Sequence, residues 1–313
     1  MTVAVTSAGG VPTAIAAAAC FGISSFLQFQ ATHEVPQRPA GRPGLLLDLL
    51  QLPIWRLSIV LAAVGFGLQV LALRLAPLIL VQPLLVTGVL WYVVVSAHVR
   101  HGRPDRVIVV GTLVCLASLA AFLTIAQPSP GSGAGGLDTL STALPLGIGL
   151  ASVVAVCLLL ARRVDPEWRP VPLSLAAGVC YGVTAGFVRS LAPSFADGFA
   201  GVFAHWEAYA ILVLGPLGVL LSQNSYQAGR IGVLALVIIT VVDPLVSIGA
   251  GLVWLDETIR TGVGPVLGEI ISLAALVLGV GLVALRAPHI TEPLLPGASG
   301  PSGRRRGRVE DGI

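Results

Sequence analysis

The chain has 313 residues, of which 55% are hydrophobic and only 11% are charged, with a formal net charge of +3. An ordinary soluble domain carries roughly 25% charged residues, and a single soluble core stops growing at about this chain length. The composition therefore excludes a soluble globular protein and predicts one whose apolar side chains face lipid.

Nine apolar stretches are long enough to cross a bilayer, whose hydrocarbon core of about 30 Å needs about 20 helical residues. In chain order they are 11–30, 55–75, 77–99, 107–127, 140–161, 171–190, 208–226, 231–255 and 263–286. Helices are expected because lipid leaves exposed backbone groups without hydrogen-bond partners. Residues 128–138 are expected to be a flexible linker, and the tail 288–313 is expected to be disordered. The predicted fold class is all-α, a polytopic membrane helix bundle.

The basic residues predict the orientation, because the side of a membrane protein that is rich in arginine is cytoplasmic. All 18 are arginines, and with nine spans only Arg74, Arg189 and Arg260 fall on the outer side. We therefore expect the N-terminus outside and the C-terminus in the cytoplasm. The absence of lysine favours a GC-rich bacterial genome, hence a multi-pass protein of a bacterial cytoplasmic membrane. The cytoplasmic set is Arg38, Arg42, Arg56, Arg100, Arg103, Arg106, Arg162, Arg163, Arg169, Arg230, Arg286, Arg304, Arg305, Arg306 and Arg308.

The chain resembles itself at a spacing of about 160 residues. Residues 15–24 and 175–184 share four identities in ten positions, and Val81-Gln82-Pro83-Leu84 matches Val242-Asp243-Pro244-Leu245. This predicts a first repeat (1–127), a linker with the fifth span (128–170), a second repeat (171–287) and the tail (288–313). Because four crossings are followed by a fifth, the repeats must be inverted. Inverted repeats are typical of secondary transporters, although a duplicated scaffold without transport is the alternative.

Small residues recur at helical spacing in the first and sixth spans, at Gly22 and at Gly178, Gly182 and Gly186. Such residues allow two helix backbones to approach closely. We expect these helices to line the interface between the halves, with ordinary close packing against another neighbour as the alternative.

Asp243 is the strongest site candidate, because an ionised side chain at the bilayer centre costs at least about 2.5–3.5 kcal/mol. Pro244 and Pro83 each remove a backbone N–H, so both helices should break at matching places. We hypothesise that Gln82, Pro83, Asp243 and Pro244 border a central cavity, where Asp243 binds a proton or a cationic group. The alternative is a hydrogen-bonded structural Asp243.

Other polar side chains in the spans are weaker candidates. Glu269 lies very roughly 9 Å from Asp243 in depth, so no direct pair is assumed. Gln69, Gln223 and Asn224 could bind substrate, or they could bond to a neighbouring helix. Asp256 and Glu257 are expected to be solvated at the outer end of the eighth span. No metal site, no cofactor site and no enzyme motif is predicted, since zinc, nucleophile-elbow and Walker patterns are lacking.

The second half carries a family pattern in Gln227–Ile231, Val242–Ser247 and Trp254–Thr258. It resembles the drug/metabolite transporter superfamily, EamA-like branch, and Gln-Ala-Gly and Asp-Pro are also similar to NIPA-like magnesium transporters. In this resemblance Glu257 matches the family Glu, whereas Ser96 takes its place in the first half. The family has ten helices, and here segments 31–54 and 191–207 stand where the second helix of each half would be. Residues 45–50 are expected to form a short interfacial helix.

The resemblance implies a secondary transporter that moves a small metabolite by alternating access, coupled to an ion or to exchange. A Mg²⁺ transporter and a non-transporting membrane scaffold or assembly protein are the alternatives. The expected partners are the lipid bilayer and a small-molecule or ion substrate, with no nucleic acid, and a homodimer is one option for the assembly.

Overall fold

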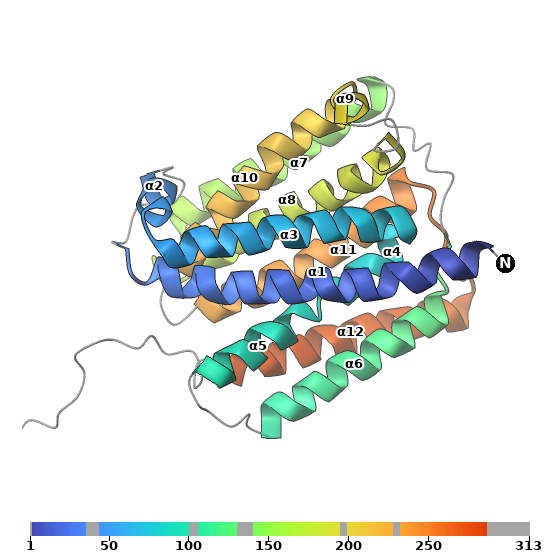
Figure 1. Cartoon of the computed structure of the whole chain (residues 1–313), viewed down its shortest axis with the longest axis horizontal. Helices are drawn as coiled ribbons and strands as arrows, with labels where there is room; N and C mark the ends of the chain where they lie inside the picture. Colours follow the sequence, from blue (N-terminus) through green and yellow to red (C-terminus); the bar gives the residue numbers. More distant parts are fainter. Residues whose placement is uncertain are drawn as a thin grey trace, which may run out of the picture.

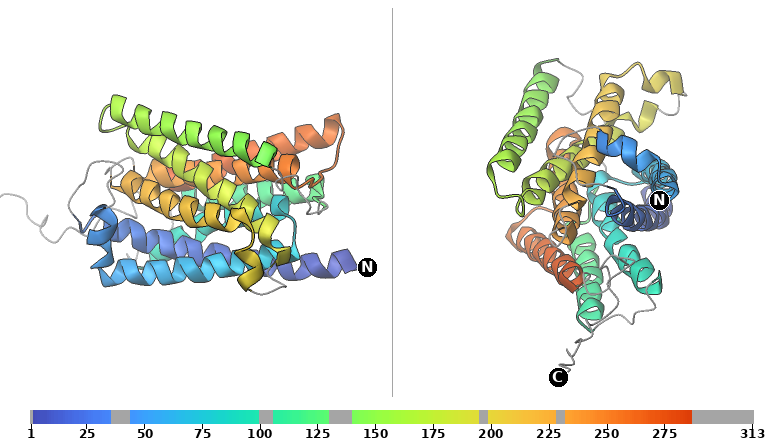
Figure 2. Two further views of the ribbon diagram at one scale, coloured as in Figure 1. Left: turned by 90° about the horizontal axis from the view of Figure 1, so that it is seen from above. Right: turned by 90° about the vertical axis from the view of Figure 1, so that its left-hand side faces the viewer.

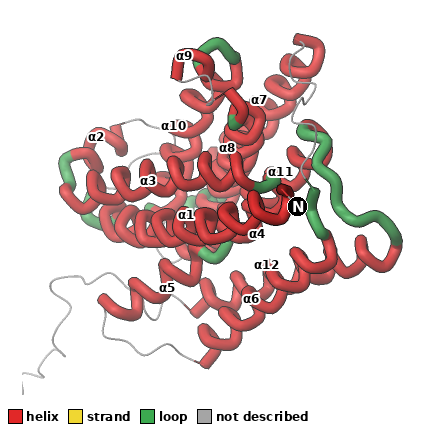
Figure 3. Tube along the Cα trace, turned by 45° about the vertical axis from the view of Figure 1, so that its right-hand side comes forward, coloured by secondary structure: helices red, strands yellow, loops and turns green. Residues whose placement is uncertain are grey.

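The computed structural model describes residues 2–35, 44–99, 106–129, 140–194, 199–227 and 232–286. Within these ranges the chain is helical and forms no strand (Figure 3). Twelve helices follow one another along the chain: α1 (Thr2–Thr32), α2 (Gly44–Leu50), α3 (Pro53–Leu75), α4 (Leu78–Leu85), α5 (Gly88–Val99), α6 (Arg106–Ala126), α7 (Leu140–Arg163), α8 (Pro170–Leu191), α9 (Phe199–Val202), α10 (Trp206–Tyr226), α11 (Gly232–Trp254) and α12 (Val263–Arg286). The predicted fold class, a polytopic helical bundle, is confirmed.

Among the described residues, eight helical stretches are long and apolar enough to cross a membrane, and they coincide with eight of the nine predicted spans. The remaining predicted span, 140–161, is the fifth in chain order. The helix α7 occupies its position and is not one of the eight. Large apolar side chains point outward along these helices: Val60, Leu113, Val253 and Ile271 are each at least 60% exposed. In a bilayer such side chains meet lipid, so the bundle needs no second apolar layer around it.

Short helices follow the first helix of each half. The helix α2 forms at residues 44–50, where a short helix was predicted, and it buries Leu45 and Leu49 against Ala31 and Trp55. Its counterpart is the four-residue α9, which follows α8. Residues 130–138 of the predicted linker 128–138 lie outside the described residues, as do the tail 288–313 and Arg38, Arg42, Arg100, Arg103 and Arg230.

The third predicted span is interrupted, whereas the eighth is not. Between α4 and α5 the chain leaves the helix at Val86 and Thr87, three residues after Pro83 (Figure 1). By contrast, α11 runs through Pro244 without interruption, so the prediction of matching breaks is wrong for the second half. One proline removes only one backbone hydrogen bond, and close packing against α8 holds α11 together across that gap.

The helices of each half pack in the same order. In the first half α1 packs against α3, α4 and α5, and in the second half α8 packs against α10 and α11. The helices α6 and α12 lie side by side and join the halves (Figure 1). The helix α7 packs against α8 at the edge of the bundle, where it lies outside the other helices (Figure 2).

The glycines predicted between the halves instead pack inside each half. A Cβ atom on Gly22 would lie 2.1 Å from the carbonyl oxygen of Gly88 on α5, and one on Gly182 would lie 2.7 Å from that of Asp243 on α11. Gly178 faces Val242 and Gly186 faces Ala250, both also on α11. The expectation that they line the interface between halves is therefore corrected, because the first helix of each half needs close contact with its own third helix.

A different glycine pair brings the halves together. A Cβ atom on Gly279 of α12 would lie 3.0 Å from the carbonyl oxygen of Gly111 on α6. A Cβ atom on Gly111 would likewise lie 3.0 Å from the carbonyl oxygen of Gly279. The two helix backbones therefore approach closely at this crossing, as small residues permit in membrane helices.

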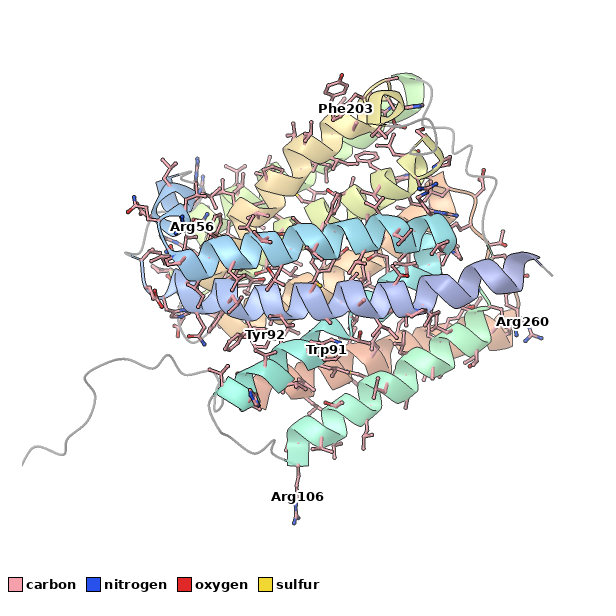
Figure 4. All side chains as sticks on the ribbon, in the orientation of Figure 1. Arg56, Trp91, Tyr92, Arg106, Phe203 and Arg260 are labelled. Atoms are coloured by element: carbon pink, nitrogen blue, oxygen red, sulfur yellow. The ribbon has the colours of Figure 1, made fainter. Side chains whose placement is uncertain are left out.

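Three labelled arginines fit the predicted alternation. Arg56 and Arg260 lie at opposite ends of the bundle (Figure 4). The backbone N–H of Arg260 donates to the carbonyl of Ala126, the last residue of α6, so Arg106 at the start of α6 lies at the far end of that helix from Arg260. Which end faces the cytoplasm stays a prediction.

Candidate functional site

The two prolines of the repeated motif meet at one pocket. Pro83 from α4 and Pro244 from α11 both line it, together with Val86 at the break after α4. The pocket has room for about one water molecule, about 20 Å³. The other lining residues come from α11 and α12: Thr240, Val241, Leu245, Leu273, Leu276, Val277 and Val280. The hypothesis that Pro83 and Pro244 border a shared cavity agrees with this geometry.

The polar neighbours of these prolines, Gln82 and Asp243, are not among the lining residues. Asp243 is half-buried, and its Oδ1 lies 3.2 Å from the hydroxyl of Ser247, one turn further along α11. The same hydroxyl lies 3.2 Å from the carbonyl oxygen of Gly182 on α8. Asp243 therefore sits at the seam between α8 and α11, where its own carbonyl packs on Gly182.

Two other buried polar groups lack hydrogen-bond partners among the described residues. Gln82 is 1% exposed and its Nε2 is unpaired, and Glu269 on α12 is 5% exposed with Oε1 unpaired. Most buried polar atoms in proteins are hydrogen-bonded, so each exception indicates a water, a ligand or a mobile part. Asp243 bonds to Ser247 of its own helix and not to Glu269 among the described residues, in line with their predicted separation.

A chain of side-chain hydrogen bonds connects the two halves near the ends of α1 and α10. The Nε2 of Gln223 donates to the Oε1 of Gln28 on α1, and the Nε2 of Gln28 donates to the hydroxyl of Ser24 at 2.9 Å. Ser24 then donates to the carbonyl of Ser58 on α3 at 2.7 Å. Gln223 is fully buried and its Oε1 has no partner within the described chain. This network crosses from the second half to the first.

The remaining amide candidates, Asn224 and Gln69, do not line the proline pocket. Asn224 donates from Nδ2 to the carbonyl of Leu220 in its own helix, at 2.7 Å. Gln69 is buried on α3, away from the proline pocket's lining. Sequence reasoning missed Tyr181, whose hydroxyl lies 3.1 Å from that of Ser222 on α10. The spacing of Ser24 and Gln28, one turn apart, was the available signal for the network.

Glu257 is buried, which corrects the expectation that it is solvated. It is 3% exposed, and its two carboxylate oxygens accept the backbone N–H groups of Leu78 at 2.7 Å and Ile79 at 2.9 Å. These are the first residues of α4, whose N–H groups have no partners within the helix and whose N-terminus favours negative charge. The chain can deliver Glu257 there because Asp256, which stays exposed, adopts a φ of 51°.

Arg189, in the last turn of α8, completes this cluster. Its Nε lies 3.2 Å from Oε1 of Glu257, and its Nη1 donates to the carbonyl of Leu73 in α3. Glu257 and Arg189 belong to the second half, whereas residues 73–79 form the corner between α3 and α4 in the first. The sequence had no signal for this pairing, because the two side chains are 68 residues apart.

Comparison with known proteins gives a relative but no activity. The chain is 25% identical over 245 residues to an uncharacterized protein of Corynebacterium glutamicum, covering 78% of this chain and 83% of the relative. No protein-family model matches the chain, and no solved structure matches it. The similarity extends over most of both chains but does not assign a substrate.

Proposed function

We propose that this chain is a secondary transporter, and not an enzyme, that moves a small metabolite across a bacterial cytoplasmic membrane by alternating access. The observation that carries the proposal is the pocket where Pro83 of one half meets Pro244 of the other. In secondary transporters, substrate sites lie near the bilayer midplane, at the interface between repeats and next to interrupted helices. Here the interruption after α4 lies at the pocket itself, since Val86 lines it.

The packing of the two halves supports the proposal. Each half places its first helix against its second and third helices, and each has a short helix after the first. Two units with the same internal contacts but opposite directions can exchange conformations, which gives outward- and inward-open states of similar energy. The inverted orientation follows from the helix count between them, with α7 as the fifth crossing.

Asp243 is the residue that we propose to bind the coupling proton or a cationic group of the substrate. It directly precedes the pocket proline, and its carboxylate is half-buried beside the hydroxyl of Ser247. Gln82 occupies the matching position in the first half, with a buried amide nitrogen available for a hydrogen bond. Glu269, Gln69, Gln223 and Asn224 are secondary candidates, which the structure does not bring to the pocket wall.

The test begins with a screen of metabolites for those that raise the thermal stability of the purified protein, because a ligand that binds only the folded state stabilises it. Hits are then tested for counterflow in proteoliposomes. Asp243→Asn should lower the initial rate by at least about tenfold, because a neutral amide cannot carry the proton or bind the cation. Asp256→Asn, which removes an exposed carboxylate of the loop after α11, is the matched control.

Each outcome of the flux measurement decides between functions. Solute exchange that depends on Asp243 supports the proposal, and wild-type rates in Asp243→Asn contradict the role of this residue. Uptake of Mg²⁺ without solute exchange would replace the proposal by a divalent cation route. Absence of any flux, with the protein folded and inserted, would favour a scaffold or assembly protein.

A further inference from the structure

The end of the bundle that carries Arg260 has polar contacts between the halves that the proposed transport site does not use. Glu257 and Arg189 of the second half hold the α3–α4 corner of the first half through the N–H groups of Leu78 and Ile79 and the carbonyl of Leu73. All these groups lie within one turn of a helix end. The corner is therefore held by a charged pair and not by apolar packing alone.

A second contact joins the halves at the same end. Ser129, after α6, and Thr258, next to Glu257, form an antiparallel bridge with N···O distances of 2.9 and 3.3 Å. The N–H of Arg260 adds a bond of 2.9 Å to the carbonyl of Ala126. Because Thr258 follows Glu257 directly, the bridge and the carboxylate must move together.

The contacts of Glu257 and Arg189 with the α3–α4 corner, together the clamp, lie close to the proposed site along α4. Ile79 precedes Pro83 by four residues in α4, which is about 6 Å along a helix. Gly251 also packs under the carboxylate, since a Cβ atom there would lie 3.0 Å from Oε2 of Glu257. Ile79 and Val81, which stand between the carboxylate of Glu257 and Pro83 along α4, are both fully buried.

The chemistry of the clamp favours two discrete states. A buried carboxylate that loses its partners is strongly unfavourable, so Glu257 either keeps its bonds or moves into water. Arg189 is 15% exposed and is already in contact with solvent. The N–H groups of Leu78 and Ile79 are orphan donors of a helix N-terminus, which water can satisfy once the corner separates.

At the opposite end, the repeat puts no carboxylate at the position that matches Glu257. The residue that corresponds to Glu257 in the repeat is Ser96, which is buried in α5. A single hydroxyl cannot accept two N–H bonds and pair with an arginine at once. The contacts that Glu257 makes therefore cannot be reproduced by Ser96 at the matching position.

We infer that Glu257, Arg189 and the α3–α4 corner form a gate, closed in this structure, which must separate for the pocket to open toward the end that carries Arg260. This inference rests on the proposed transport function for its role, but the opening itself is a property of the protein that can be measured without any substrate.

The experiment uses a reversible cross-link across the gate. Residues that exchange both bonds in an antiparallel pair have Cα atoms about 5.5 Å apart, which suits a disulfide. Ser129→Cys and Thr258→Cys are introduced together after the four native cysteines are replaced by alanine. The reporter is Val81→Cys, at a position that is fully buried between the clamp and Pro83. Its reaction with a water-soluble maleimide is compared in two proteins. One carries the oxidised bridge cysteines, and the uncrosslinked reference keeps Ser129 and Thr258.

Oxidation should slow labelling of Val81→Cys by at least about tenfold, because labelling tracks the population of the open state. Glu257→Gln should speed it by about tenfold, since the charge-assisted bonds are lost. Glu167→Gln, which changes an exposed carboxylate between α7 and α8, should leave it unchanged. A second reporter, Ser225→Cys, which is fully buried in the last turn of α10, distinguishes gate opening from general loosening and should label equally in all variants.

Equal labelling of Val81→Cys with and without the disulfide would overturn the gate, and so would wild-type flux in cross-linked protein. A pair that does not oxidise would contradict the bridge geometry on which the gate depends. Faster labelling of both reporters in Glu257→Gln would show that Glu257 only holds the fold. If labelling responds as expected but no variant shows flux, the gate stands and the proposed function fails.

Discussion

The two halves of the molecule have the same helix order but carry different chemistry at matching positions. In the first half the third span is interrupted between α4 and α5, and its motif holds the neutral Gln82. In the second half α11 is continuous, and the motif holds Asp243. Where the second half has Glu257, three residues after the end of α11, the first half has Ser96. The first half thus carries the interrupted helix, and the second half carries the two acidic side chains.

This division has a physical reason. A charge inside a membrane needs a rigid environment that supplies its partners, and the continuous α11 packed against α8 provides one for Asp243. A broken helix exposes backbone groups that can change partners, as the N–H groups at the start of α4 do when they bind Glu257. We therefore expect substitutions in the second half to affect charge and those in the first half to affect backbone motion.

The largest difference in the free energy of unfolding should appear between the variants Glu257→Ala and Ser96→Ala. Removing Glu257 leaves Arg189 without its ion-pair partner and two helix N–H groups without an acceptor, which should lower the free energy of unfolding by about 3–5 kcal/mol. Ser96→Ala should lower it by about 1 kcal/mol or less, as for other single hydroxyl bonds in membrane helices. Unfolding in mixed micelles measures both. Equal losses would mean that the two ends are closed in the same way.

A smaller effect is expected where the first and third helices of each half meet. Gly22→Ala places a methyl group 2.1 Å from a backbone oxygen of α5, and Gly182→Ala places one 2.7 Å from a backbone oxygen of α11. Each should cost about 1–3 kcal/mol through overpacking, with the greater loss at Gly22. Gly67→Ala on α3 meets no atom within 4 Å and serves as control. A loss at Gly67 similar to that at Gly22 would show that flexibility, not space, matters.

The smallest effect concerns the two prolines. Pro83→Ala restores an N–H group opposite the carbonyl of Ile79, so hydrogen exchange at residues 84–87 should slow by about fivefold, as one bond of about 1 kcal/mol implies. Pro244→Ala should change exchange in α11 less, because that helix is already continuous. Exchange followed by mass spectrometry compares the two. Slower exchange only in Pro244→Ala would contradict this prediction, because it would locate the weaker backbone hydrogen bonding in the second half.

Sequence reasoning located the helices well because span length and hydropathy are local properties. Of the four residues predicted to border a central cavity, Pro83 and Pro244 line one pocket, whereas Gln82 and Asp243 do not. It failed at Glu257, because the distance of a side chain from a helix end does not reveal which distant backbone it meets. The same limit applies to Gly22 and Gly182, where small size indicated close packing but not the partner helix.

The sequence by itself determined that this chain is a helical membrane protein with a repeated motif, because apolar length and periodicity decide whether a segment can be solvated by lipid. Only the tertiary structure decided which helix each glycine touches, that α11 remains continuous at Pro244 and that Glu257 holds the start of α4. Lipid solvates all apolar faces alike, so the choice among neighbours depends on close backbone contacts and on a few polar groups that find partners only in the folded bundle.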